Sequence, residues 1–232
     1  MITFPRPSVD SRSEWGIVPF VTHRKGEHPA PAADLHVLTN RNGGVVRLMY
    51  RDEDPRDRPV RDVLWARCSF SHDDTGMPTG EPMWKYLHPY RQMITMLSGR
   101  CQICTRPART PLGWIFLAGP KDQDPDAPLI VTAQPPVCRR HVRMAAALCR
   151  HMEGNPMVFL AGSAPLYGVL GSVYGWGPNR EFTVIEAPDG AVRFNDPRIP
   201  TMLASQLVRR LSSFRVLDVD GLLAALEATD AH

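Results

Sequence analysis

The chain reads CQIC at residues 101–104 and, 33 residues later, CRRH at residues 138–141. Each stretch places two metal-ligating side chains three positions apart. Two intervening residues allow a tight turn, or the first turn of a helix, to direct both donor atoms at one ion. Three thiolates and one imidazole suit Zn²⁺, which takes sulfur and nitrogen ligands in a tetrahedron. The spacing therefore predicts a zinc site with four ligands: Cys101, Cys104, Cys138 and His141.

The residues between and after these pairs predict the local fold. Gly113–Ala118 (GWIFLA) and Leu129–Ala133 (LIVTA) favour two strands of a hairpin, joined by a polar loop. A helix-prone run follows Pro136, and its first turn would carry the second ligand pair. The order of knuckle, hairpin and helix over residues 101–150 resembles the treble-clef zinc fingers. This resemblance implies a bound zinc and a local fold, but no activity, because treble clefs occur in proteins of many unrelated functions.

The expected zinc is structural. Four protein ligands leave no coordination position for water or substrate, and three thiolates reduce the Lewis acidity of the ion. Zinc deaminases need an H-x-E upstream of P-C-x-x-C, whereas the only H-x-E here, His151–Glu153, lies downstream. Nucleases of the HNH type need a hairpin histidine, which neither expected strand supplies. The alternative to a metal site is that Cys104 and Cys138 are small buried residues and His141 is solvated.

Composition limits the class of protein. The chain has 232 residues, of which 43% are hydrophobic and 22% charged, with a net charge of +3, so it is not disordered throughout. No apolar run approaches the roughly 20 residues of a membrane-spanning helix, and the N-terminus lacks the pattern of a signal peptide. We therefore expect a cytoplasmic protein without a membrane partner. Five cysteines, an odd number, favour free thiols over a disulfide framework.

Outside the zinc region, short strands and helices alternate without the regular rhythm of a parallel sheet, which predicts an α+β fold. Residues 1–34 are rich in proline and predict an extended arm. In residues 35–100 we expect a hairpin of Val45–Tyr50 and Val63–Phe70, followed by a helix from Pro89 that Gly99 ends.

The C-terminal third predicts a strand, a hairpin and two helices. Residues 162–179, rich in glycine and aromatic residues, are interpreted as a linker. The expected elements are a strand at Met157–Ala161, a hairpin of Phe182–Glu186 and Ala191–Phe194, and helices near Met202–Ser213 and Val219–Ala228, with Asp218 capping the second.

These elements divide the chain into an arm (1–34), a hairpin with a helix (35–100), a zinc module (101–152) and a hairpin with two helices (153–232). We expect residues 35–232 to form one compact unit, with antiparallel hairpins and short helices packed around the central treble-clef-like zinc module. The whole chain loosely resembles uncharacterised proteins of GC-rich actinobacteria, a resemblance that implies no activity.

Two weaker patterns suggest binding surfaces. The expected zinc helix carries Arg139, Arg140 and Arg143, and a basic helix on a metal knuckle can grip phosphates; the alternative is a solvated outer face. Tyr174 and Trp176 lie among glycines and could line a cleft for a small molecule; the alternative is that they pack a loop onto the core.

No set of acid, base and nucleophile stands out. Cys68 and His72 would lie about 13 Å apart on a strand, so a half-buried cysteine is the better interpretation. The leading hypothesis is a zinc-stabilised binding or regulatory protein that engages protein or nucleic acid near the metal helix. The alternatives are an enzyme of specialised metabolism with a structural zinc and an unrecognised pocket, and a structural component of an assembly.

Overall fold

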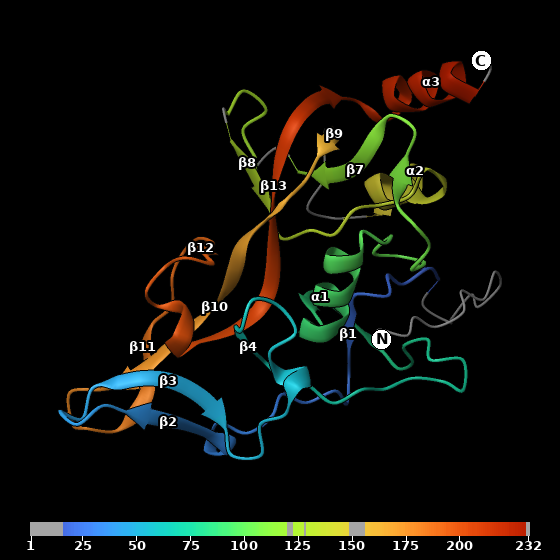
Figure 1. Cartoon of the computed structure of the whole chain (residues 1–232). Coiled ribbons are helices and arrows are strands. Elements are labelled where there is room, and N and C mark those ends of the chain that lie inside the picture. Colours follow the sequence, from blue (N-terminus) through green and yellow to red (C-terminus); the bar gives the residue numbers. More distant parts are fainter. Residues whose placement is uncertain (1–15, 120–122, 128, 149–155, 231–232) are drawn as a thin grey trace.

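The computed structural model describes residues 16–119, 123–127, 129–148 and 156–230. Its central element is the strand β13 (Met202–Leu217), which runs through the middle of the molecule in Figure 1. Within the described residues, β13 belongs to a nine-stranded sheet whose main order is β11-β10-β13-β9-β7-β6. The described residues are rich in sheet and form three α-helices, an arrangement that is compatible with the predicted α+β class.

The two halves of β13 pair with different partners. Its first half pairs with β10 (Leu166–Trp176) and, in parallel, with the short β4 (Leu64–Trp65). Its second half pairs with β8 (Ile130–Thr132) and β9 (Met157–Ser163), both antiparallel. The strand β9 continues the sheet to β7 (Gly113–Ala118), and β7 to β6 (Arg109–Thr110). One strand therefore connects both parts of the sheet.

The prediction of a helix over residues 202–213 was wrong, because these residues form β13. Leu203, Leu207, Val208 and Leu211 have the spacing of one helix face, and the adjacent Leu207 and Val208 are both buried. In the structure the strand pairing shifts register at two β-bulges between β10 and β13, so the apolar positions do not alternate regularly. A bulge adds one residue to one strand and moves the following side chains to the other face. This irregular spacing imitates a helical period.

The glycine-rich segment interpreted as a linker contains the strand β10. Two of its glycines sit where neighbouring strands approach closely: a Cβ on Gly168 would lie 2.1 Å from the Val192 carbonyl oxygen, and one on Gly171 would lie 2.1 Å from that of Leu203. The glycines are therefore positions where a strand accommodates adjacent backbone. Glycine content suggested a linker because the sequence alone does not show which backbone lies beside it.

The two segments predicted to form a C-terminal hairpin, Phe182–Glu186 and Ala191–Phe194, do not pair with each other. Instead β11 (Phe182–Glu186) and β12 (Val192–Arg193) both pair with β10, at successive positions along the same edge. Ala187–Gly190 therefore interrupts an edge strand rather than forming a hairpin turn. The strand β10 is much longer than β11 or β12. Its edge therefore has room to pair with both short segments.

The two strands of the expected hairpin, Val45–Tyr50 and Val63–Phe70, also pair with other strands instead of with each other. The first segment forms β3 (Val45–Tyr50) as predicted, but it pairs with β2 (Leu35–Thr39). Of the second segment, only β4 is a strand. The ion pair of Arg67 Nη2, just after β4, with Asp57 Oδ2 (2.7 Å) joins this part of the chain to the intervening loop. The strand β4 pairs with β13 instead of β3.

The two strands expected to form the zinc hairpin do not pair with each other. Gly113–Ala118 is the strand β7 and Ile130–Thr132 is the strand β8, but β7 pairs with β6 and β9. The strand β8 reaches β13, where Ile130 is buried beside Leu211. The long connection between β7 and β8 permits this crossing, and it exposes fewer backbone groups than an isolated hairpin would.

The N-terminal arm is part of the fold where it is described; residues 1–15 lie outside the described residues. The strand β1 (Thr22–Arg24) pairs with β5 (Pro82–Leu87), a strand that was not predicted from the sequence. Phe20 and Val21 are buried. Single turns of 3-10 helix occur at Ala32–Asp34, Pro55–Asp57 and Ile199–Thr201.

The helix α1 (Pro89–Ser98) has the predicted bounds, and Gly99 ends it in a left-handed conformation with φ 60°. The side chain of Gln92 is fully buried and binds the backbone of β13: its amide donates to Leu207 O (2.9 Å), and its oxygen accepts from Leu207 N (2.9 Å). The same amide donates to Ala133 O (2.6 Å), just after β8. Arg209 donates to the carbonyl of Met96 near the end of α1. The helix is therefore joined to β13 by polar contacts at both ends.

The other helices are α2 (Arg139–Leu148) and α3 (Val219–Asp230). The predicted cap of α3 is confirmed, since Asp218 Oδ1 accepts from Gly221 N at 2.6 Å. Among the described residues, no helix is both long and apolar enough to cross a bilayer.

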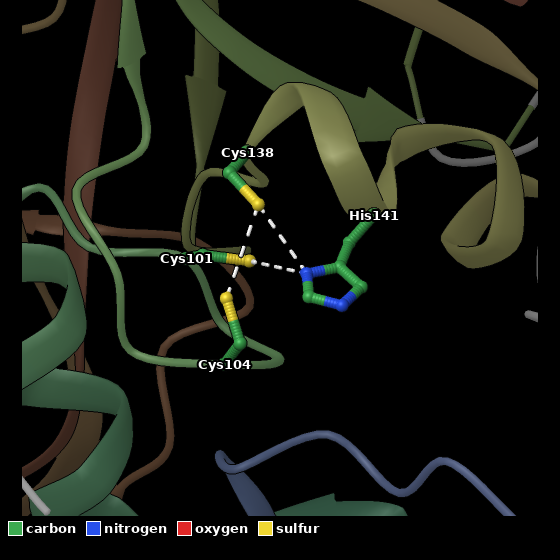
Figure 2. A group of neighbouring side chains, drawn as sticks. All are labelled: Cys101, Cys104, Cys138 and His141. Carbon is green, nitrogen blue, oxygen red and sulfur yellow. Dashed lines mark hydrogen bonds between the residues drawn. The ribbon is translucent and has the colours of Figure 1, made fainter. Parts of the chain in front are cut away.

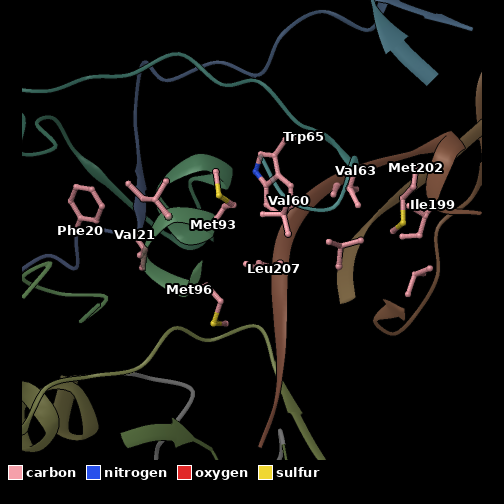
Figure 3. Close-up of a cluster of buried hydrophobic side chains, with 14 residues drawn as sticks. Phe20, Val21, Val60, Val63, Trp65, Met93, Met96, Ile199, Met202 and Leu207 are labelled. Carbon is pink, nitrogen blue, oxygen red and sulfur yellow. The ribbon is translucent and has the colours of Figure 1, made fainter. Parts of the chain in front are cut away.

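Two apolar clusters matter for the site. One fills the space between α1 and the first half of β13, and includes Met93, Met96 and Leu207 (Figure 3). The second lies where α2 and α3 pack on β7 and β9, and includes Ile115, Val142 and Leu222. Cys101 belongs to this second cluster, and Cys104 and Cys138 pack against it.

We expect Gln92→Leu to destabilise the protein by about 2 kcal/mol or more, because it leaves the Leu207 N–H buried without a hydrogen-bond partner. Urea unfolding followed by circular dichroism measures the loss. Gln134→Leu, at an exposed position, is the matched control and should change stability little. Equal stabilities of the Gln92→Leu and Gln134→Leu proteins would contradict the role assigned to Gln92.

Candidate metal centre

The four predicted ligands converge on one point (Figure 2). Cys101 and Cys104 come from the turn after α1, whereas Cys138 and His141 come from the start of α2. All four donor atoms lie within 4.8 Å of one another. The structure thus brings together a Cys3His group that could hold a metal ion, from segments far apart in the chain.

The distances within this group fit a tetrahedral ion. Cys104 Sγ lies 3.9 Å from Cys138 Sγ, and His141 Nδ1 lies 3.8 Å from Cys101 Sγ and 3.3 Å from Cys138 Sγ. A Zn–S bond of about 2.3 Å places two sulfurs of a tetrahedron about 3.8 Å apart, and the shorter Zn–N bond brings nitrogen closer. A disulfide would need about 2.05 Å between sulfurs. The donors therefore have the spacing of metal ligands.

The backbone shapes the first ligand pair. Cys101 N donates to Arg106 O (2.8 Å), and Thr105 N donates to Cys101 O (2.9 Å). Thr105 has φ 59°, a left-handed conformation that turns the chain back after Cys104. Just before the pair, a Cβ on Gly99 would lie 2.1 Å from the ring of Trp114. Only glycine fits there, so the end of α1 and the start of the knuckle are closely defined.

Backbone hydrogen bonds also hold the second ligand pair. Val137 N donates to Ile115 O (2.9 Å) on β7, and Gln102 N donates to Pro136 O (3.0 Å). These bonds join the knuckle, β7 and the start of α2 before any metal is considered. The N-terminal segment adds a further contact, since Val21 N donates to Gln102 O (3.2 Å). The ligands thus sit where four segments meet.

Without a cation, the four groups share protons. Hydrogen bonds to the sulfurs of Cys104 and Cys138 raise the pKa of His141 to about 9. Hydrogen bonds from the thiols of Cys101 and Cys104 lower the pKa of Cys138, and the same sharing raises the pKa of Cys101. At neutral pH the cluster therefore pairs a Cys138 thiolate with a His141 imidazolium, and a metal ion must displace the remaining protons to bind. The donor set suits zinc, as its sulfur-rich composition predicts.

The predicted arginines differ in their surroundings. Arg143 Nη2 forms an ion pair with Asp220 Oδ1 (2.8 Å) on α3, so it connects two helices. Arg139 and Arg140 lie in the first turn of α2, next to Cys138. Together with Arg106 and Arg109 they line a cavity of about 300 Å³, called here the arginine cavity. Sequence analysis missed Arg106 and Arg109, because nothing in their sequence places them beside α2.

The predicted aromatic pair lies on β10, next to the β2–β3 hairpin. The ring of Tyr174 lies 5.5 Å from that of Phe182, and Trp176 Nε1 donates to Gly43 O (3.1 Å) in the hairpin turn. These contacts pack the hairpin against β10.

Two residues that could act as an acid or a base also have partners of their own. Glu81 binds Lys25, and His88 binds the Ser69 carbonyl.

The structure places Cys68 beside a histidine other than His72. Cys68 Sγ lies 3.6 Å from His23 Nε2, and Glu27, 3.9 Å from the same ring, forms a 2.6 Å ion pair with Arg91. Burial raises the pKa of Cys68 to about 11, so the thiol stays protonated at neutral pH. This cluster was not predictable, because 45 residues separate Cys68 from His23.

Cys149 and His151, which follow the predicted second ligand pair, lie outside the described residues.

Comparison with protein-family models, with curated proteins and with solved structures finds no match to this chain. Neither the treble-clef nor the actinobacterial resemblance gains support from these comparisons. The function must therefore be argued from the geometry of the site.

We expect about one zinc per chain in the purified protein, and its loss in the variants Cys104→Ser and His141→Ala. Structural zinc contributes on the order of 10 kcal/mol in zinc-finger peptides, comparable to the stability of a whole domain, so both variants should also lose solubility. Elemental analysis measures the metal, and Cys68→Ser is the matched control that should retain it. A folded His141→Ala protein with full zinc would show that His141 is not a needed ligand.

Zinc occupancy should fall as the pH is lowered from about 8 to about 5, because thiolates and imidazole bind metal only after losing their protons. A colorimetric chelator added at each pH measures the released zinc. Occupancy that stays constant over this range would contradict ligation by this cluster.

Proposed function

We propose that this chain is a zinc-stabilised binding protein that engages nucleic acid or a protein partner through the surface at the start of α2. The observation that carries the proposal is the adjacency of the Cys3His group and the arginine cavity, since Cys138 belongs to both. The metal would hold the helix, and the helix would present the arginines.

The ligand set supports a structural rather than a catalytic metal. Four donors at tetrahedral spacing leave no position for a substrate. The local order also supports a treble-clef arrangement: a knuckle at residues 101–104, the β6–β7 hairpin directly after it, and α2 carrying the second ligand pair. The hairpin in this arrangement is shorter than the one expected from the sequence.

The arginines near the metal group differ from those elsewhere in the molecule. Many arginines pair with carboxylates, as Arg58 does with Glu53 and Arg91 with Glu27. In the part of the chain that the structure describes, no carboxylate pairs with Arg106, Arg109 or Arg140. Exposed guanidinium groups without acidic partners create a local positive potential, which favours an anionic partner.

The alternative function, an enzyme with a structural zinc, has one observation in its favour: Cys68 lies within reach of the His23 imidazole. Two features of the pair oppose a nucleophilic role. The thiol is protonated at neutral pH, and the Glu27 carboxylate that would orient the histidine is bound to Arg91. We therefore favour the binding function.

Arg139→Ala combined with Arg140→Ala should weaken binding to nucleic acid and reduce its salt dependence. Each lost phosphate contact lowers the slope of log K against log salt by about 0.9 for duplex DNA and about 0.7 for a single strand. Fluorescence anisotropy with labelled DNA and RNA, titrated with KCl, measures both effects.

The matched control is the pair Arg51→Ala and Arg180→Ala, which removes the same charge from exposed positions outside the site. A wild-type protein that shows no salt-sensitive binding to DNA or RNA would contradict the nucleic-acid form of the proposal. The binding function would then have to be exerted on a protein partner.

A further inference from the structure

We propose that the arginine cavity is a binding site for a nucleoside phosphate, either a free mononucleotide or the phosphorylated end of a strand. The inference rests on the proposed function and names the chemistry of its partner. The arginines would hold the phosphate, and the apolar floor of the cavity would contact the sugar and the base.

The cavity is open to solvent and is lined by three elements. The turn before β6 and that strand form one wall, the first turn of α2 forms the second, and Leu226 of α3 closes the base. Its volume of about 300 Å³ is at the lower end of the range for small-molecule sites, about 300–1,000 Å³. The cavity thus suits one small ligand rather than a large one.

The charge of the cavity favours a phosphate. Four arginines are among its lining residues, and no aspartate or glutamate is. Three thiolates and Zn²⁺ would leave one net negative charge beside it (2 − 3 = −1), which the four arginines outweigh. Guanidinium groups present paired N–H donors that match two phosphate oxygens, and the start of α2 adds the positive end of its helix dipole.

The rest of the lining favours a nucleotide over a bare phosphate. Pro107, Ala108 and Leu226 supply apolar surface at the floor. The guanidinium of Arg109 lies over the ring of Trp114, with 5.5 Å between Arg109 Cζ and the ring centroid. An arginine braced on one face by an aromatic ring can stack a base on the other. A phosphopeptide would use the arginines but would not need such a stacking surface.

The test is isothermal titration calorimetry of the full-length, zinc-loaded protein. The probes are adenosine and uridine monophosphates, the unphosphorylated nucleosides, inorganic phosphate, a 5′-phosphorylated trinucleotide, its unphosphorylated form, and a phosphoserine peptide. We expect a nucleoside monophosphate to bind about tenfold more tightly than inorganic phosphate, and the nucleosides to bind far more weakly, because charged hydrogen bonds supply most of the affinity.

Arg106→Gln and Arg140→Gln should each weaken mononucleotide binding about tenfold or more, since each removes charge-assisted hydrogen bonds to the phosphate. Arg51→Gln is the matched control and should bind as the wild type does. Unchanged zinc content in each variant shows that the metal group, and hence the wall of the cavity, is intact.

The outcomes separate this inference from the proposed function. Preference for the phosphorylated trinucleotide over the mononucleotide identifies a strand end, and equal affinity identifies a free nucleotide; both support the inference. Tightest binding to the phosphoserine peptide overturns it. If long DNA or RNA binds in a salt-sensitive manner while no phosphorylated probe binds the cavity, the nucleoside-phosphate site is wrong and the binding function stands. If neither the phosphorylated probes nor long DNA or RNA binds, the nucleoside-phosphate site and the nucleic-acid form of the proposed function are both wrong.

Discussion

The backbone pairing of β13 is the constraint on which the rest of the structure depends. Its sixteen residues share hydrogen bonds with β10 and β4 in the first half and with β8 and β9 in the second. Gln92 then fixes α1 against this strand through its backbone groups. Since the first ligand pair follows directly from α1, the position of the metal group is set by β13.

The metal group and the arginine cavity are two faces of one local arrangement. A metal ion bound by Cys138 and His141 would hold the start of α2, and the ion pair of Arg143 with Asp220 joins its outer side to α3. Packing of Leu222 and Leu226 from α3 completes the support. A helix held in this manner keeps its arginines in place, which reduces the entropy lost when a ligand binds. The zinc would thus serve binding by limiting motion.

Charge is used differently in the two parts of the molecule. Around Glu27, a buried carboxylate accepts hydrogen bonds from Arg91 and from the backbone of Arg24 and Ser71, and all three contacts hold segments together. Beside α2, Arg106, Arg109 and Arg140 lie at the surface, and no carboxylate among the described residues pairs with them. Paired charges stabilise the fold, whereas clustered charges of one sign are costly unless a ligand of the opposite sign compensates them.

The sequence by itself predicted the four residues of the Cys3His group, the bounds of α1 and the cap of α3. These features depend on residues within a few positions of one another, such as Cys101 and Cys104 or Asp218 and Gly221, so local spacing is sufficient. Only the tertiary structure decided that residues 202–217 are a strand, that β3 pairs with β2, and that Arg106 joins Arg140 at one cavity. Strand pairing and clustering of surface charge depend on which distant segments lie side by side. That arrangement depends on β-bulges, on glycines where two strands approach closely, and on long connections between strands. None of these features produces a regular hydrophobic period in the sequence.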